Sequence, residues 1–120
     1  MKINYNQLDD SKKQIQFTHG IYSLESNKST KWIWSSTIFG GIVNNIDYVT
    51  LTVTSEVDNI LYYDNNEMEL KTDCLNVVKI KTSGKSEFKI NLKDPYTVVG
   101  DNRTLGVKIL SISIDNDVIF

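Results

Sequence analysis

Residues 48–55 alternate between two kinds of side chain. Val49, Leu51 and Val53 occupy every second position, and threonines lie between them. A period of two made of β-branched and apolar residues is typical of a strand that buries one face. A strand of this kind has to pack its apolar face against another layer, so the chain is expected to be built from sheets.

The same alternation recurs in two later parts of the chain. Residues 78–81 and 87–92 alternate in this way, and the turn-forming sequence Thr82-Ser83-Gly84-Lys85 between them predicts a β-hairpin. Residues 60–70 contain two short apolar runs around Asp64-Asn65-Asn66, whose side chains tolerate left-handed backbone. A second hairpin is therefore expected there.

The phase of the alternation changes between Leu105 and Ile114. Either a β-bulge lies near Ile109 and Leu110, or both faces of this strand are buried, and both interpretations make it a central strand. Earlier in the chain, residues 31–43 form a long extended piece that Gly40-Gly41 is expected to break. Residues 93–104 contain the single proline and are expected to form the longest loop.

No stretch of the sequence shows a helical stripe of useful length. About eight short strands, with a turn signal roughly every ten residues, predict an all-β fold, an antiparallel two-sheet β-sandwich of the jelly-roll type. The apolar content of 40% is enough for one core in 120 residues. Residues 14–120 are expected to form one domain, and residues 1–13 a loosely held arm.

The charge balance disfavours nucleic acid as a partner. The chain has 13 Lys and Arg against 15 Asp and Glu, a net charge of −2, and both signs are interleaved along it. Residues 1–17 carry Asp9, Asp10, Lys12 and Lys13 where a signal peptide would need an apolar stretch. No run approaches the ~18 apolar residues of a membrane span. The expectation is a cytoplasmic protein without a membrane span.

The sequence also argues against catalysis and against a cofactor. His19 is the single histidine, Cys74 follows Asp73, whose charge disfavours a thiolate, and the glycines form no phosphate-binding motif. We expect no enzymatic activity, no cofactor and, because cysteine and histidine are scarce, no structural zinc. Asp115-Asn116-Asp117 and Asp64-Asn65-Asn66-Glu67 either supply oxygen ligands to Ca²⁺ or serve as turns through their own backbone hydrogen bonds.

Aromatic and charged residues near the two ends of the chain form the most informative set. Trp32 and Trp34 point to the same side of a strand, where they are either a stacking platform for sugar rings or part of the core. Glu25 and Arg103 are expected to pair, with Asp101 as the competing partner. This pairing either fastens the long loop to the N-terminal strand, or Asp101, Arg103 and Trp32 line a glycan pocket.

These residues resemble a known family. The chain is similar to a small β-sandwich domain in three places: a strand with Gly20, Tyr22 and Glu25, then Trp32 after a basic residue, and a closing Asp101-x-Arg103-x-Leu-Gly-Val. That domain occurs beside or fused to bacterial glycosyltransferases and methyltransferases of surface-polysaccharide gene clusters. The resemblance covers residues 20–114 and implies a non-catalytic module associated with glycans.

The leading functional hypothesis is therefore a carbohydrate-associated binding module linked to bacterial surface-glycan synthesis. Its partner would be a glycan or a protein of the glycosyltransferase type. The alternative is a protein interaction or oligomerisation domain that docks a partner through exposed aromatics and an unpaired sheet edge. The predicted ligand-binding residues are Trp32, Trp34, Asp101, Arg103 and, as rim aromatics, Tyr22 and Tyr96; no catalytic or metal-binding residue is assigned.

Overall fold

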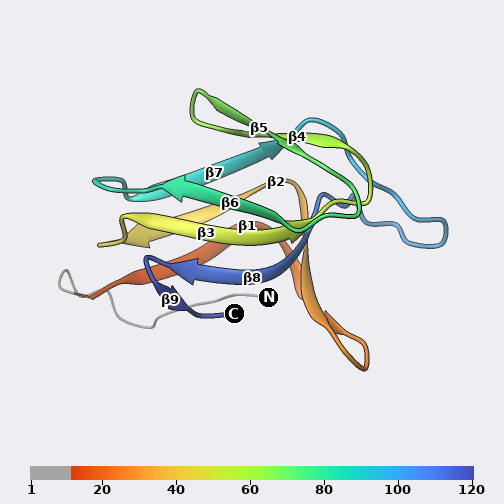
Figure 1. The fold of residues 1–120 in the computed structure, drawn as a ribbon, viewed down its shortest axis with the longest axis horizontal. Helices are drawn as coiled ribbons and strands as arrows, with labels where there is room; N and C mark the ends of the chain where they lie inside the picture. Colours follow the sequence, from red (N-terminus) through yellow and green to blue (C-terminus); the bar gives the residue numbers. More distant parts are fainter. Residues whose placement is uncertain (1–11) are drawn as a thin grey trace.

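The computed structural model describes residues 12–120, which form β-strands joined by turns and loops (Figure 1). Every strand pairing is antiparallel, and the described residues contain no helix, so none is available to cross a membrane. The strands are β1 (Gln14–Ser26), β2 (Lys31–Asn44), β3 (Tyr48–Thr54), β4 (Asn59–Tyr63), β5 (Asn66–Leu70), β6 (Asn76–Lys81), β7 (Glu87–Leu92), β8 (Lys108–Ile114) and β9 (Asp117–Val118).

Strand β2 joins two groups of strands into one curved sheet. Its first half pairs with β8 through Ile33 and Trp34, its second half pairs with β7 through residues 38–42, and β1 runs along its other edge. The strand order is β5-β4-β7-β2-β8-β3-β6, and this sheet nearly closes into a barrel. The all-β, antiparallel prediction is confirmed, whereas a two-sheet jelly-roll sandwich is not, because β2 makes the ladder continuous.

The two glycines of β2 do not break the strand as expected. A Cβ atom on Gly40 would lie 2.1 Å from the carbonyl oxygen of Phe88, and one on Gly41 would lie 1.9 Å from that of Gln16. The backbones of β7 and β1 therefore approach β2 so closely here that only glycine fits. Gly40 and Gly41 thus mark the place where the backbones of β1, β2 and β7 come closest, in what we call the close crossing, within a continuous strand β2.

One of the two predicted hairpins is wrong. Strand β6 pairs with β3, and β7 pairs with β2 and β4, so these consecutive strands lie in different parts of the sheet. The turn between β6 and β7 is bound to the turn before β3, because the amide of Thr82 donates to the carbonyl of Asp47 at 2.7 Å. The second hairpin is confirmed: β4 and β5 pair with Tyr63 opposite Asn66, and Asp64 adopts a φ of 52° in the turn.

The change of phase near the C-terminus is a β-bulge. In the pairing of β3 with β8, Thr52 lies opposite Ser111 and Val53 lies opposite Ile109, so Leu110 is the extra residue. Strand β8 lies between β2 and β3, as expected of a central strand, although it begins at Lys108 and not at Leu105.

The core lies inside the curved sheet and takes one side chain in two from most strands. In β3, Val49, Leu51 and Val53 are fully buried, as their alternation predicts. Each such side chain stabilises the fold by roughly 1.5–3 kcal/mol relative to an exposed one. The largest fully buried residues are Phe39, Ile15, Ile33, Leu51, Leu70, Ile80, Ile90, Leu105, Ile109 and Ile112.

The predicted N-terminal arm, residues 1–13, falls almost wholly outside the described residues. Its last member, Lys13, has its Nζ atom 2.8 Å from a carboxylate oxygen of Asp115. The other carboxylate oxygen of Asp115 accepts hydrogen bonds from the amides of Asp47 and Tyr48, each at 3.0 Å. Asp115 thus connects the start of β1 to the turn before β3.

Candidate functional site

Residues 93–107, which we call the arm, fold back against the outer face of β2. Tyr96 and Leu105 exchange backbone hydrogen bonds of 2.7 and 2.8 Å, which gives the arm the shape of a short hairpin. The amide of Gly106 donates to the carbonyl of Ser35 at 2.7 Å, and the amide of Ser35 donates to Val107 at 2.9 Å. These bonds fix the base of the arm on β2.

The arm covers Trp34. This indole is only 5% exposed and does not belong to the core cluster inside the curved sheet. It stacks on Tyr96 with ring centroids 6.0 Å apart and an interplanar angle of 20°. Trp34 is thus part of a second, smaller apolar cluster between β2 and the arm, and its face is not open to a sugar ring.

Arg103 is held by two carboxylates. Its Nη1 atom donates to Glu25 at 2.9 Å, and its Nη2 and Nε atoms donate to Asp101 at 2.7 and 3.0 Å. The guanidinium also lies 5.3 Å from the ring centre of Tyr22, whose hydroxyl donates to the carbonyl of Thr104 at 2.9 Å. We call Tyr22, Glu25, Asp101 and Arg103 the arginine cluster; it fastens the arm to β1.

Electrostatics in the arginine cluster follow from these bonds. Hydrogen bonds from the Arg103 side chain and backbone hold the pKa of the Asp101 carboxyl below its usual value. The same bond to Asp101, with a second one to Glu25, raises the pKa of Arg103. The donors of Arg103 face carboxylates of its own chain, so the cluster offers a ligand little unused hydrogen-bonding capacity.

Trp32 differs from Trp34. It is half-buried, and the Nζ atom of Lys108 lies 4.7 Å from its ring centre and 5.2 Å from that of Trp34, which places both indoles on one side of β2. Lys108 also approaches Glu56 at 3.4 Å. The indole Nε1 of Trp32 is buried and has no hydrogen-bond partner among the described residues. Trp32 is therefore the one predicted stacking residue that retains exposed surface.

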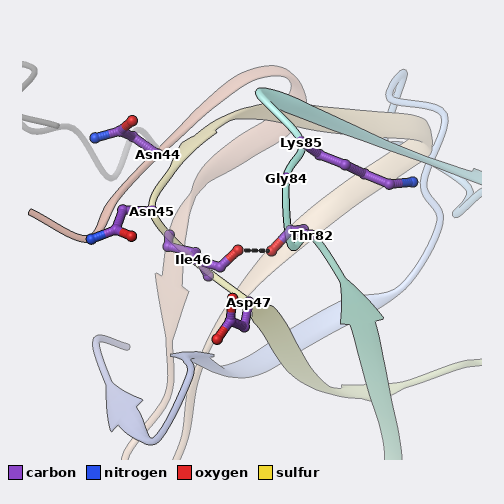
Figure 2. A pocket seen from close by; sticks show the side chains of 7 residues that line it. All are labelled: Asn44, Asn45, Ile46, Asp47, Thr82, Gly84 and Lys85. Atoms are coloured by element: carbon purple, nitrogen blue, oxygen red, sulfur yellow. Dashed lines mark hydrogen bonds between the residues drawn. The ribbon is translucent and has the colours of Figure 1, made fainter. Parts of the chain in front are cut away.

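A polar pocket of about 330 Å³ lies between the turn before β3 and the turn after β6 (Figure 2). Figure 2 shows that the side chains of Asn44 and Lys85 point in opposite directions. At its floor, the hydroxyl of Thr82 donates to the carbonyl of Ile46 at 2.7 Å. Binding sites need convergent polar groups, and this pocket instead has the character of a structural junction between two turns.

A second opening lies where the barrel fails to close. Among residues 12–120, β5 pairs only with β4 and β6 pairs only with β3, and we call the gap between β5 and β6 the seam. The hydroxyl of Tyr63 donates to the carbonyl of Lys81 across one end. At the other end, the side chain of Asn76 accepts from the amide of Lys71 and donates to its carbonyl, both at 3.1 Å.

A cavity of about 170 Å³ lies along the seam between these two closures. Apolar side chains form much of its lining, from Leu61, Met68, Val78 and Ile80. Charged residues stand at its rim, with Glu67 on β5 and Lys79 and Lys81 on β6. The sequence gives no sign of this cavity, because the predicted hairpin placed β6 beside β7.

The remaining candidates are scattered. His19 is exposed, and its Nδ1 atom lies 3.0 Å from the hydroxyl of Thr18. Cys74 is exposed. Asp64 and Asp115 each occupy a turn with a φ of 52°, consistent with the turn interpretation. Within the described part of the chain, no cluster of three or more His, Cys, Asp or Glu side chains has the geometry to hold a metal ion.

The structure thus brings Trp34 together with Tyr96, and Tyr22 together with Asp101 and Arg103, and Trp32 lies on the same side of β2 as Trp34. Lys108, which approaches both indoles, escaped the sequence analysis because a single lysine carries no pattern. Comparisons with models of known protein families, with curated proteins and with solved structures found no match to this chain.

Proposed function

We propose that this chain is a non-catalytic interaction domain that docks an extended segment of another polypeptide along the seam. One observation carries the proposal: the strand order of residues 12–120 ends at β5 and at β6, and an apolar cavity lies beside the edges of these two strands. Addition of a strand to a free edge supplies main-chain hydrogen bonds, and pockets for alternate side chains supply specificity.

The free edge of β6 can be assigned residue by residue. The amide of Thr82 faces the β3 side, where it bonds to Asp47, so the alternation of an antiparallel ladder turns the backbone groups of Lys79 and Val77 toward the seam. The carbonyl of Lys81, which Tyr63 reaches across the gap, fits the same alternation. An incoming strand would therefore pair with Val77 and Lys79.

The side chains beside this edge suit an alternating partner. Val78 and Ile80 point inward at the cavity, whereas Val77 is 58% exposed on the outer face together with Lys79. Every second side chain of an added strand would enter the apolar cavity, and the others would remain at the surface. Burial of the inward side chains is the main source of affinity in this arrangement.

Synthetic peptides test the proposal. Peptides of about eight residues that alternate valine with aspartate, serine or lysine are titrated against the protein, and binding is followed by fluorescence anisotropy and by amide exchange. At least one peptide is expected to bind and to slow exchange at Val77 and Lys79. If none binds and exchange at these amides is unchanged, docking along the seam is wrong.

A proline variant locates the binding edge. Lys79→Pro removes an amide that faces the seam without removing a bond to β3, so the fold is expected to persist while peptide binding is lost. Lys89→Ala, on the outer face of β7, is the matched control and is expected to bind as the wild type does. Peptide binding that survives Lys79→Pro would exclude β6 as the docking edge.

A second candidate function is supported by Trp32. The exposed part of its half-buried indole favours a small carbohydrate site of the kind that the resemblance implies. Glycans are titrated while tryptophan fluorescence is recorded. A saturable shift that Trp32→Phe removes, in a chain that retains Trp34, supports this candidate; a flat titration with every glycan contradicts it.

A further inference from the structure

We infer that the segment docked at the seam is strand β5 of a second copy of the chain, in a two-fold dimer. This inference rests on the proposed function and names its partner. In such a dimer, β6 of each copy pairs with β5 of the other, so one symmetric contact uses both free edges of both copies.

The free edge of β5 follows from its hairpin. Strands β4 and β5 are joined by a two-residue turn with Tyr63 opposite Asn66, and this closing pair is hydrogen-bonded. Pairs along the ladder then alternate, so the backbone groups of Glu67 and Glu69 point away from β4. The edge of β5 therefore presents glutamates where the edge of β6 presents lysines.

One register satisfies all of these groups together. When Glu67 lies opposite Lys81 of the second copy, Glu69 lies opposite Lys79, and both pairs join opposite charges on the outer face. In the same register, Met68 faces Ile80 on the inner face. Within one copy β5 and β6 have opposite directions, because Tyr63, just before β5, contacts Lys81 at the end of β6, and Lys71, just after β5, contacts Asn76 at the start of β6. A two-fold rotation about an axis parallel to the strands keeps these directions, so β5 of one copy also runs antiparallel to β6 of the other.

Lysines on an edge strand normally discourage pairing with other strands. At the seam they select a partner instead, since Lys79 and Lys81 are matched by acidic side chains and are repelled by a second β6 edge. The strand β5, with Glu67, Met68, Glu69 and Leu70 in alternation, carries the required pattern of acidic outer and apolar inner residues.

The hydroxyl of Tyr63 competes with this dimer. It occupies the carbonyl of Lys81, which the amide of Glu67 in the second copy requires. Tyr63→Phe removes the competitor and leaves the carbonyl without its partner in the monomer. The variant is therefore expected to dimerise more tightly than the wild type.

Charge reversal provides the decisive experiment. Sedimentation velocity over protein concentrations from about 1 μM to about 1 mM gives the dimer dissociation constant. K79E/K81E and E67K/E69K are each expected to weaken the homodimer by about tenfold or more, because like charges then face each other at both contacts. The control K89E/K93E changes the net charge as K79E/K81E does, at exposed sites away from the seam, and is expected to dimerise normally.

Two restored pairings make the result specific. An equimolar mixture of K79E/K81E and E67K/E69K is expected to form heterodimers, because each contact again joins opposite charges. The variant that carries all four substitutions is expected to recover the homodimer. These two samples also keep the inference testable if one double variant folds poorly, which circular dichroism detects.

The inference is overturned if the wild type stays monomeric over the whole range, or if its dimer is indifferent to the charge reversals. Failure here is distinct from failure of the proposed function. If the protein is monomeric but still binds a synthetic peptide at β6, only the dimer is wrong, and the proposed docking of another polypeptide stands. If the protein neither dimerises nor binds any of the peptides, both the dimer and the proposed function are wrong.

Discussion

The Oε2 atom of Glu25 lies 2.9 Å from the Nη1 atom of Arg103, although these residues are 78 positions apart in the chain. Arg103 also holds Asp101 within its own arm, so a single guanidinium connects the arm to β1. Both carboxylates are partly exposed, at 35% and 23% of their side-chain area, which keeps the contribution of each pair modest.

The arginine cluster predicts a pH dependence of stability. The pKa of Asp101 is lower in the folded state than in the unfolded state, whose value is about 3.9, so its contribution is complete above pH ~4 and is lost as the pH falls through the folded value. The melting temperature of Asp101→Asn is therefore expected to fall less on acidification than that of the wild type. Asp73→Asn, at an exposed loop residue, is the control. Identical acid profiles for wild type and Asp101→Asn would contradict the prediction.

Trp34 and Trp32 are expected to contribute very differently to stability. Trp34→Ala empties the cluster beneath the arm and should cost about 3–5 kcal/mol of unfolding free energy. Trp32→Ala removes a half-buried ring and should cost clearly less. Urea denaturation measures both. Equal losses would mean that the arm does not shield Trp34 in solution.

The glycines of β2 predict a steric effect. Gly41→Ala places a methyl group on the carbonyl of Gln16 and is expected to destabilise the fold by about 1–3 kcal/mol or to prevent folding. Gly84→Ala meets no neighbour and carries only the cost of its φ of +72°. Thermal melts compare them, and a milder effect at Gly41 than at Gly84 would refute the close crossing.

The buried hydrogen bond from Thr82 to Ile46 is expected to contribute to the stability of the fold. Thr82→Val keeps the shape of the side chain but leaves the carbonyl of Ile46 without its donor, at an expected cost of about 1–3 kcal/mol. Thr52→Val, on the outer face of β3, is the matched control and should change stability by less than about 0.5 kcal/mol. Comparable losses in guanidinium denaturation would show that the Thr82 bond adds little.

Local pattern predicted the strands better than their partners. The alternation in β3, the β4–β5 turn and the bulge at Leu110 are short-range features, and the structure confirms them. The pairing of β6 with β3 depends instead on the bond from Thr82 to Asp47, which joins residues remote in sequence. Proximity along the chain therefore gave the wrong neighbour for β6.

The site residues show the same division. Spacing placed Trp32 and Trp34 on one face, and Lys108 lies near both rings. The exposure of the two indole rings depends on the arm (residues 93–107), because Tyr96 of the arm covers Trp34 and leaves Trp32 half-buried. Sequence patterns say which side of a strand a ring occupies, but not whether a distant loop covers that side.

The pairing of β2 with two different strands, β8 along its first half and β7 along its second half, affects how quickly the native state can form. On the edge opposite β1, the first half of β2 acquires a strand partner only when Ile109 reaches Ile33, late in the chain, whereas its second half pairs there with β7. Contacts of such long sequence separation slow folding to the millisecond-to-second range. Until β8 arrives, β2 and β3 each retain an unsatisfied flank, so refolding yield is expected to drop steeply as protein concentration rises.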